Sequence, residues 1–307
     1  MSRLTATLLL VAAMALVGAN VPFGKALVAE LPLLPFMVYR FALSSAALAL
    51  LLPLEPPRSS SWPSVRQIGG IAAMSLVGMV MFTLLMLEGL RRTSSIDAGV
   101  ITATMPAVVA LLGLIVHAER PGVRRLFAIA LAAAGIAIVS VSGAATGERT
   151  LIGNLLVGGA VLCEAAFVLM ARQLSRDLPP IRLSLAANLA GLAIVLPPAL
   201  PELATLDLAA VRPGMWALAT WYVLAASVFA LLLWYRGLPH VETSLAGLAT
   251  VALPLTALAV AVLWLGEPLA GGQIAGGALA ILAIVLAARE PAHPVRPPAA
   301  SRARLGL

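Results

Sequence analysis

The chain has 307 residues, of which 61% are apolar and only 11% are charged, and its mean hydropathy is +1.03. Soluble globular domains carry about 25% charged residues, so this composition excludes a water-soluble protein and indicates a membrane protein. The net charge of +7 does not indicate nucleic-acid binding, because the basic residues stand in short loops without interleaved aromatic residues. The single cysteine, Cys163, excludes an intrachain disulfide.

Apolar segments long enough to cross a bilayer follow one another along almost the whole chain. A spanning helix needs about 20 apolar residues. We predict ten of them, at residues 4–29, 33–54, 67–90, 97–116, 123–142, 151–172, 181–200, 214–237, 242–264 and 270–288. Strands of a membrane barrel would alternate polar and apolar residues, and these segments do not. The predicted fold class is therefore an all-α polytopic membrane protein.

Charge and composition predict how the chain sits in its membrane. Most of the arginines fall in loops on the side of the N-terminus, so the positive-inside rule places both termini in the cytoplasm. Lys25 is the only lysine among 20 basic residues and alanine is abundant, which is typical of a GC-rich bacterial genome and indicates a bacterial cytoplasmic membrane. Residues 289–307, rich in Pro, Ala and Arg, are predicted to be a disordered cytoplasmic tail. The first apolar segment lacks a convincing cleavage site, so we do not expect it to be a removable signal peptide.

An internal repeat divides the chain into two copies, which we place at residues 1–146 and 147–288. The repeated positions, at one constant offset, are Gly89 and Gly237, Gly99 and Gly247, Thr102 and Thr250, Pro106 and Pro254, and Glu119 and Glu267. Each copy contains five predicted spans, and because five is odd the second copy must run upside down relative to the first. Inverted repeats of this kind are typical of secondary transporters, whose sites lie near the membrane midplane.

The repeated segment resembles a known family. The stretch from Met105 to Arg120, and still more the stretch from Leu253 to Pro268 with its Gly266–Glu267 pair, resemble EamA-type domains. Only the first copy departs, with His117-Ala118 before the glutamate. The resemblance covers about residues 5–288 and implies a drug/metabolite transporter of ten spans around a central cavity. Within that superfamily the chain looks most like YddG-type exporters of aromatic and other amino acids.

Three prolines inside predicted spans form the first group of candidate residues. A proline has no backbone N–H, so the carbonyl four residues earlier loses its helical partner. Pro106 would free the carbonyl of Thr102, Pro254 that of Thr250, and Pro22 that of Gly18. Such carbonyls near the midplane can accept a hydrogen bond from a substrate ammonium. The alternative is that threonine hydroxyls or neighbouring helices satisfy them and the kinks only shape packing.

Ionisable and polar residues within the spans form the second group. Charges at membrane depth are costly and face a cavity or a partner. Glu164, in the middle of the sixth span, is a candidate for binding an amine or a proton, or for an internal ion pair. Arg40 is a candidate for a substrate carboxylate, or for reaching the interface. Asn20 and Asn188 are further polar candidates, with interhelical hydrogen bonds as the alternative, whereas Lys25 and Glu88 lie near span ends and favour a structural role.

Adaptable apolar side chains form the third group. Residues Met79, Phe82, Thr83 and Met86 share one face of the third span, and Trp221 and Tyr222 lie inside the eighth. Methionine and aromatic side chains suit a pocket for bulky apolar substrates, although packing is the commoner use of such a stripe. The repeated Glu119 and Glu267 are expected to cap the helix that follows each of them.

These features predict an exporter of amino acids, aromatic or otherwise bulky and neutral, that works by alternating access without a cofactor or metal. A monomer would suffice for a complete cavity. Efflux of cationic drugs or other small metabolites is the alternative, and a receptor or scaffold without transport is the alternative from another class. The sequence does not decide between two modes of energy coupling, facilitated diffusion down the substrate gradient and proton exchange through Glu164.

An intramembrane enzyme is not expected. The three histidines lie at helix ends or in the tail, so no buried Ser–His dyad forms. No paired intramembrane aspartates, no His/Cys metal cluster and no P-loop occur in the sequence.

Overall fold

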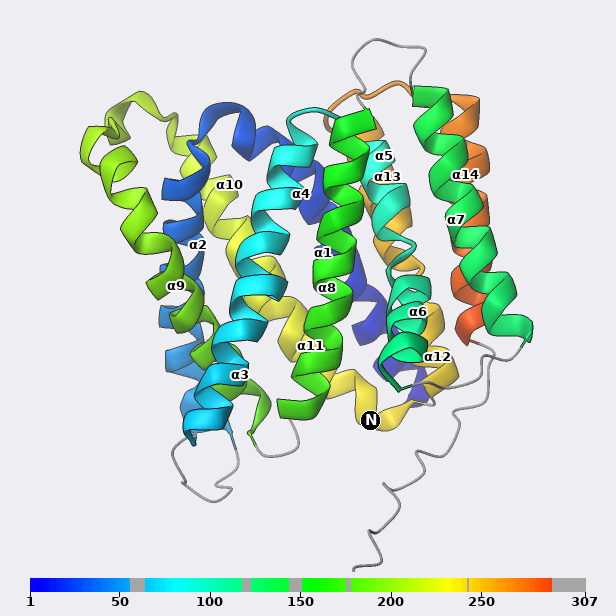
Figure 1. The fold of residues 1–307 in the computed structure, drawn as a ribbon, viewed down its shortest axis with the longest axis horizontal. Helices are drawn as coiled ribbons and strands as arrows, with labels where there is room; N and C mark the ends of the chain where they lie inside the picture. Colours follow the sequence, from blue (N-terminus) through cyan, green and yellow to red (C-terminus); the bar gives the residue numbers. More distant parts are fainter. Residues whose placement is uncertain (56–63, 118–122, 144–150, 175–177, 242, 289–307) are drawn as a thin grey trace, which may run out of the picture.

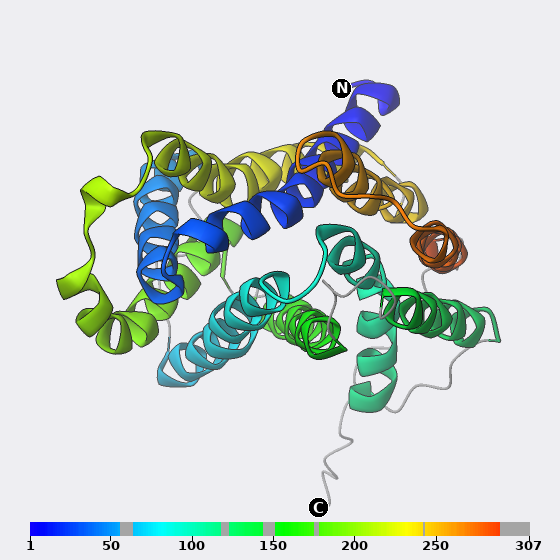
Figure 2. The same cartoon turned by 90° about the horizontal axis from the view of Figure 1, so that it is seen from above.

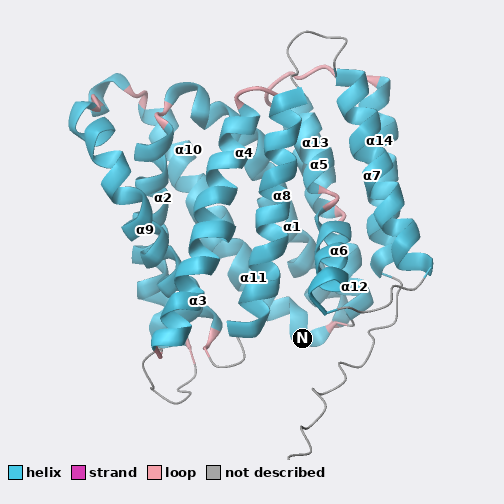
Figure 3. Ribbon diagram, in the orientation of Figure 1, coloured by secondary structure: helices cyan, strands magenta, loops and turns pink. Residues whose placement is uncertain are grey.

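The computed structural model describes residues 1–55, 64–117, 123–143, 151–174, 178–241 and 243–288, and these residues form helices and loops without a strand (Figure 3). The α-helices are, in chain order, α1 (Arg3–Glu30), α2 (Leu33–Leu51), α3 (Val65–Ser75), α4 (Phe82–Leu90), α5 (Ser95–Thr102), α6 (Met105–His117), α7 (Val123–Gly143), α8 (Leu151–Leu174), α9 (Pro180–Thr205), α10 (Pro213–Leu224), α11 (Ala230–Gly237), α12 (Thr243–Ala249), α13 (Ala252–Leu263) and α14 (Gly271–Ala288). Short 3-10 helices cover Leu52–Leu54, Leu208–Ala210 and Leu238–His240. The predicted tail and Glu119 lie outside the described residues.

The helices stand side by side as a bundle whose members alternate in direction. Among the described residues, 8 helical stretches are long and apolar enough to cross a membrane, and shorter apolar helices cover Leu126–Val139 and Gly271–Leu286. In Figure 1, α1 runs from the lower end of the bundle to the upper end, whereas α8 runs from the upper end to the lower. The predicted all-helical, multi-pass architecture is therefore confirmed.

Two of the stretches are broken near their middle, where the sequence predicts kinks. The fourth predicted span splits into α5 and α6 at Ala103–Thr104, and the ninth predicted span splits into α12 and α13 at Thr250–Val251. Pro106 and Pro254 follow these breaks within the first turn of the second half, where a missing N–H costs little. By contrast, Pro22 lies inside α1, which continues past it as a single helix.

The third and eighth predicted spans contain a feature that the sequence does not reveal, a π-helical segment. One, η2 (Leu76–Met81), joins α3 to α4, and the other, η5 (Ala225–Phe229), joins α10 to α11. Such π turns are rare and occur frequently at functional sites. The two segments occupy matching positions in the two copies of the repeat.

Equivalent helices of the two copies pack against each other at both edges of the bundle. Helix α2 packs on α9 at one edge, and α7 packs on α14 at the other (Figures 1 and 2). Glycines allow close approaches between helices: a Cβ on Gly276 of α14 would lie 2.8 Å from the carbonyl oxygen of Gly135 on α7, and a Cβ on Gly237 of α11 would lie 2.8 Å from that of Ala6 on α1. Small residues at such crossings let helix backbones pack tightly in a membrane.

The largest apolar core lies where α1 crosses α4, α8 and α10. Leu27 of α1, Leu87 of α4 and Val157 of α8 are fully buried there, and Tyr222 of α10 is 8% exposed. A second close approach fixes α1 to α13, because a Cβ on Gly18 would lie 2.2 Å from the carbonyl oxygen of Leu253. Helix α1 is thus the element around which the polar residues described below are arranged.

Candidate functional site

Arg40 of α2 is held inside the bundle. Its Nη1 donates a hydrogen bond to the hydroxyl of Thr83 on α4, whose side chain is almost fully buried. Its Cζ lies 5.6 Å from the centroid of the buried Phe41 ring, within the range of a cation–π interaction. Arg40 therefore turns inward to Thr83 instead of extending to the membrane interface, and it keeps further N–H donors for other partners.

Glu164 of α8 faces the same region. The charge of Arg40 acts electrostatically on Glu164 and on Tyr222, so α2, α8 and α10 bring these three side chains near one another. Within the described part of the chain, no hydrogen bond or ion pair joins Glu164 to another residue. The internal ion pair weighed as an alternative role is thus not formed, and the carboxyl oxygens stay available as acceptors.

Asn20 of α1 contacts the backbone of α10. Its Nδ2 donates to the carbonyl of Tyr222 at 2.8 Å, three residues before the π-helical segment η5. Its Oδ1 is buried and accepts no hydrogen bond from any described residue, and the residue as a whole is only 7% exposed. The amide nitrogen of Asn20 thus makes an interhelical hydrogen bond, while the oxygen is a buried acceptor that lacks a donor among the described residues.

Further polar contacts join α2 to α10 and η5 next to Arg40. The hydroxyls of Tyr39 and Thr220 lie 2.6 Å apart, and Ser44 Oγ donates to Ser227 Oγ at 2.9 Å, within η5. The Tyr39 ring also packs on Trp216, with centroids 5.4 Å apart. These contacts fix the face of α2 that carries Arg40. We call the set Asn20, Arg40, Thr83, Glu164 and Tyr222 the mid-bundle cluster.

Several predicted residues lie apart from this cluster. Trp221 is 44% exposed and packs on Phe229, with ring centroids 5.9 Å apart. It points away from Tyr222 because neighbouring residues of a helix point in different directions. Asn188 donates to the Ser184 carbonyl of its own helix at 2.8 Å, and not to another helix as weighed above. A role of either side chain in binding a substrate stays a prediction.

The predicted apolar stripe of the third span is not continuous. The π-helical segment η2 contains Met79 and ends at Met81, just before Phe82. A π-helical turn contains more residues than an α-helical turn, so Met79 is rotated about the helix axis relative to Phe82 and Met86. Met79 packs toward α2 and α9, whereas Phe82 and Met86 pack in the core around α1. The prediction of a single face was wrong because it assumed regular α-helical spacing.

The kinked helices offer fewer free acceptors than expected. Leu253 N–H donates to the carbonyl of Thr250 at 3.1 Å, so that carbonyl is not free as predicted. A 3-10 type bond tightens the turn and replaces the partner that Pro254 lacks. The hydroxyl of Thr250 donates to the Gly247 carbonyl at 2.6 Å, and that of Thr102 to the Ala98 carbonyl at 2.7 Å. A free carbonyl at Thr102 stays a prediction.

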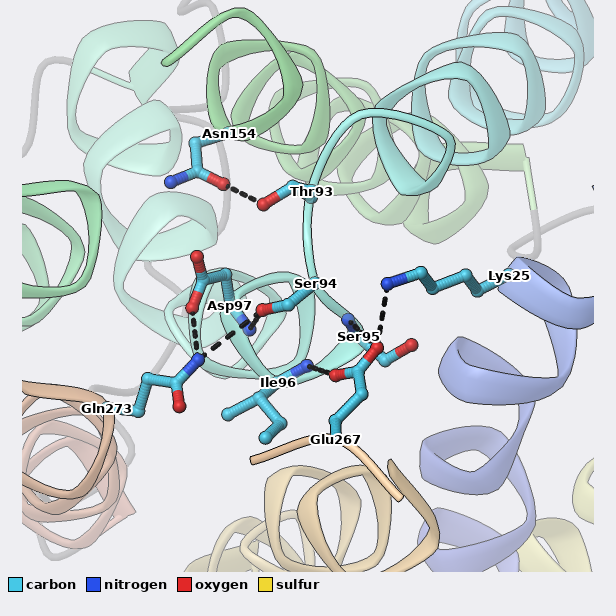
Figure 4. Close-up of polar contacts among 9 residues, drawn as sticks. All are labelled: Lys25, Thr93, Ser94, Ser95, Ile96, Asp97, Asn154, Glu267 and Gln273. Atoms are coloured by element: carbon cyan, nitrogen blue, oxygen red, sulfur yellow. Dashed lines mark hydrogen bonds and ion pairs between the residues drawn. The ribbon is translucent and has the colours of Figure 1, made fainter. Parts of the chain in front are cut away.

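A second polar group lies at the upper end of the bundle, around the start of α5 (Figure 4). Glu267 Oε1 accepts from Ser95 N at 3.0 Å and from Lys25 Nζ at 2.8 Å, and Oε2 accepts from Ile96 N at 3.1 Å. Glu267 is thus a helix cap, but the prediction that it caps the helix after it, α14, was wrong. Lys25 has the structural role expected, as does Glu88, which pairs with Arg91 and Arg92.

Sequence reasoning missed the other members of this second group. Ser94 accepts from Asp97 N at 3.0 Å and caps α5, and Gln273 Nε2 donates to Asp97 Oδ1 at 2.7 Å. Asn154 and Thr93 hydrogen-bond beside them at 2.5 Å. The spacing of Ser94 and Asp97 is a capping signature that could have located the start of α5. In the described residues, no three His, Cys, Asp or Glu side chains gather as metal ligands.

Membrane-spanning helices that enclose charged and polar side chains define a multi-pass membrane transport protein. Comparison with known families matches residues 4–141 and 151–289 to the EamA-like transporter family, and the chain belongs to that family. The family resemblance seen in the sequence is thereby confirmed for both copies.

Two relatives from Bacillus subtilis are also described as transporters. The chain is 30% identical over 301 residues to the uncharacterized transporter YetK, which covers 96% of this chain and 90% of that protein. It is 21% identical over 252 residues to the uncharacterized transporter YyaM, covering 81% and 82% of the two chains. A crystal structure described only as that of a protein superposes with a TM-score of 0.61 at 17% identity, over 93% of this chain and 97% of the other. That likeness shows the fold alone.

Proposed function

We propose that the protein is a secondary transporter that exports amino acids with bulky neutral side chains by alternating access. The observation that carries the proposal is the mid-bundle cluster: Arg40 supplies N–H donors, and Glu164 together with Asn20 Oδ1 supplies acceptors that no described residue uses. A zwitterion presents a carboxylate and an ammonium, which complement one set of donors and one set of acceptors. Arg40 would bind the carboxylate, and Glu164 with Asn20 would bind the ammonium.

The proposal includes a topology of ten spans in two inverted repeats, at residues 1–146 and 147–288, around a central cavity. Support comes from the opposite directions of α1 and α8, from the matching breaks and π-helical segments, and from the packing of α2 on α9 and α7 on α14. An odd number of spans in each copy inverts the second copy. We place both termini in the bacterial cytoplasm because most arginines then lie inside.

The outward direction of transport and the bulky side chain rest on the resemblance to YddG-type exporters. Phe82, Met86 and Tyr222 lie in the apolar core beside the polar residues and offer apolar contacts for such a side chain. Tyr222 contributes an aromatic ring, which packs on Phe36 with centroids 5.6 Å apart.

Efflux of cationic drugs is the second candidate, because Glu164 is an unpartnered carboxyl in a spanning helix. The charge of Arg40 acts on the same region and repels a cation that carries no carboxylate. We therefore favour the zwitterion.

A substrate panel tests this choice directly. Purified protein in liposomes is assayed for flux of labelled phenylalanine, leucine and alanine, and of a fluorescent quaternary ammonium dye. We expect flux of phenylalanine and leucine above empty liposomes and no flux of the dye. Flux of the dye alone would replace the proposal by cation efflux, and flux of none of the four would contradict both.

A further inference from the structure

Three elements that are distant in sequence meet at the carboxylate of Glu267. Lys25 comes from the last turns of α1, Ser95 and Ile96 supply the first backbone N–H groups of α5, and Glu267 itself lies in the loop between α13 and α14. The three donors stand 2.8, 3.0 and 3.1 Å from its two oxygens. We call this group the α5 latch; Figure 4 shows Glu267 between Lys25 and the start of α5.

The backbone conformation at Gly266 directs Glu267 toward α5. Gly266 has φ +67°, in the left-handed region that glycine adopts without steric cost. The N–H of Glu267 then donates to the Ala261 carbonyl at 3.1 Å, which ends α13 and turns the chain toward α5. The Gly-Glu pair of the second copy is therefore a helix terminator joined to a side chain that reaches another helix.

The same end of the bundle carries a second bond between the two copies. Gln273 of α14 donates to Asp97 Oδ1 of α5 at 2.7 Å, and the ring of Trp264 packs edge-on against Phe23 of α1 with centroids 5.0 Å apart. Every one of these contacts joins α1 or α5 to the segment from the end of α13 to α14. At this end, α5 is thus held by residues of the other copy.

Helix α5 is short and separate from the helix that follows it. It has 8 residues, and the break at Ala103–Thr104 separates it from α6. The latch that holds its start consists of polar contacts at the bundle end, where the Lys25 side chain is 32% exposed. Water can replace such donors and acceptors when the contact opens, at small net cost.

We infer that Glu267 is a reversible latch, which closes this end of the transport path while it binds α5 and Lys25 and releases α5 when that end opens. The inference rests on the proposed alternating access, but its test needs no knowledge of the substrate. A merely structural cap would stay bound to α5 throughout the transport cycle, whereas a latch would release it. Whether Glu267 releases α5 therefore decides between a structural cap and a latch.

The first test measures how often the start of α5 becomes accessible. Ser95 is fully buried and its Oγ has no hydrogen-bond partner among the described residues, so Ser95→Cys is a mild change. In a Cys163→Ala background, the rate at which a membrane-impermeant maleimide labels position 95 is measured on purified protein in liposomes. We expect Glu267→Gln to raise that rate about tenfold, because it weakens charge-assisted hydrogen bonds that hold the closed state.

The matched control is Glu202→Gln, which removes the same charge from the exposed end of α9. It should leave the labelling rate unchanged. An unchanged rate in Glu267→Gln, with a folded protein by gel filtration, would overturn the inference. Lys25→Met is a second variant that should raise the rate without altering the cap itself.

The second test locks the latch covalently. Because Lys25 is the only lysine and its Nζ lies 2.8 Å from Glu267 Oε1, a water-soluble carbodiimide can join them. The Glu267 carboxyl adds to the carbodiimide to give an O-acylisourea. Lys25 Nζ attacks its acyl carbon and expels the urea, so an amide forms with net transfer of one water to the reagent. Peptide mass spectrometry identifies the joined pair.

Cross-linked protein should label at position 95 at least about tenfold more slowly than untreated protein, because opening is blocked. Lys25→Arg, which keeps the charge but has no amine to join, undergoes the same modification of other carboxyls and should keep its labelling rate under the same treatment. Labelling of the cross-linked form at the untreated rate would show that the pair stays together when the end opens, and would overturn the latch. If phenylalanine is not transported, the proposed function fails while this result stands.

Discussion

The α5 latch and the mid-bundle cluster are both polar groups within an apolar bundle, but they differ in how fully their atoms are partnered. Each oxygen of Glu267 accepts at least one hydrogen bond from the protein itself. In the mid-bundle cluster, by contrast, Glu164 and Asn20 Oδ1 have no donor among the described residues. The Glu267 carboxylate is therefore fully partnered without a ligand, whereas the two acceptors of the mid-bundle cluster are not.

The difference indicates separate roles. A buried acceptor without a donor costs roughly 1–3 kcal/mol, so a protein retains one where something other than its own chain can satisfy it. A fully partnered carboxylate is already stabilised and serves to hold elements together. We therefore propose that the mid-bundle cluster binds the ligand and that the latch controls the conformation.

The largest effect is expected when the donor of the mid-bundle cluster is removed. Arg40→Gln should lower phenylalanine flux at least about 30-fold, because losing one partner of a buried charged contact costs about 2–5 kcal/mol. Flux is measured with purified protein in liposomes. Arg212→Gln is the control: its ion pair with Glu30 is exposed, and flux should stay within about twofold. An equal loss of flux in both variants would show that Arg40 matters no more for transport than an arginine at the surface.

The next largest effect concerns the unpartnered carboxyl. Glu164→Gln should lower phenylalanine flux about tenfold, because it replaces a charge-assisted contact with the ammonium by a neutral one. The midpoint of thermal unfolding should not change, since Glu164 makes no bond within the described protein. Glu88→Gln, which removes an ion-paired carboxyl near a helix end, should have little effect on flux. Normal flux in Glu164→Gln would remove this residue from the cluster.

A smaller effect, on stability, is expected at the helix crossing beside Asn20. Gly18→Ala places a Cβ 2.2 Å from the backbone oxygen of Leu253, and overpacking of this kind costs about 1–3 kcal/mol. The midpoint of thermal unfolding in detergent should fall. Gly69→Ala, in an exposed helical position with no atom within 4 Å, should leave that midpoint unchanged or slightly raised. If the two alanines behaved alike, α1 would not approach α13 as closely as described.

The smallest effect is expected at the turn that directs Glu267. Gly266→Ala places a side chain at φ +67°, which costs about 1–2 kcal/mol and weakens the latch only indirectly. Labelling of the Ser95→Cys protein should rise about threefold, less than in Glu267→Gln. Gly271→Ala, which meets no atom within 4 Å and has no positive φ, should not change it. A larger rise than that of Glu267→Gln would mean that the turn, and not the carboxylate, closes this end.

The sequence predicts the helical stretches and both proline breaks because hydrophobic length and missing N–H groups act locally. It does not reveal η2 and η5, since no residue type marks a π-helical turn, and the face assigned to Met79 was therefore wrong. It identifies Arg40 and Glu164 because charges in apolar helices are conspicuous. The partner of Glu267 could not be predicted, because α5 is distant in sequence and only the tertiary fold brings its first N–H groups to that carboxylate.

The central claim is that the mid-bundle cluster recognises a zwitterion, and competition in liposomes tests it most directly. Flux of labelled phenylalanine is measured with an excess of unlabelled phenylalanine, of phenethylamine, which lacks the carboxylate, or of 3-phenylpropionate, which lacks the ammonium. The account predicts that phenylalanine competes and that neither analogue does at the same concentration. Competition by phenethylamine as strong as that by phenylalanine would contradict it, because Arg40 would then contribute nothing to recognition.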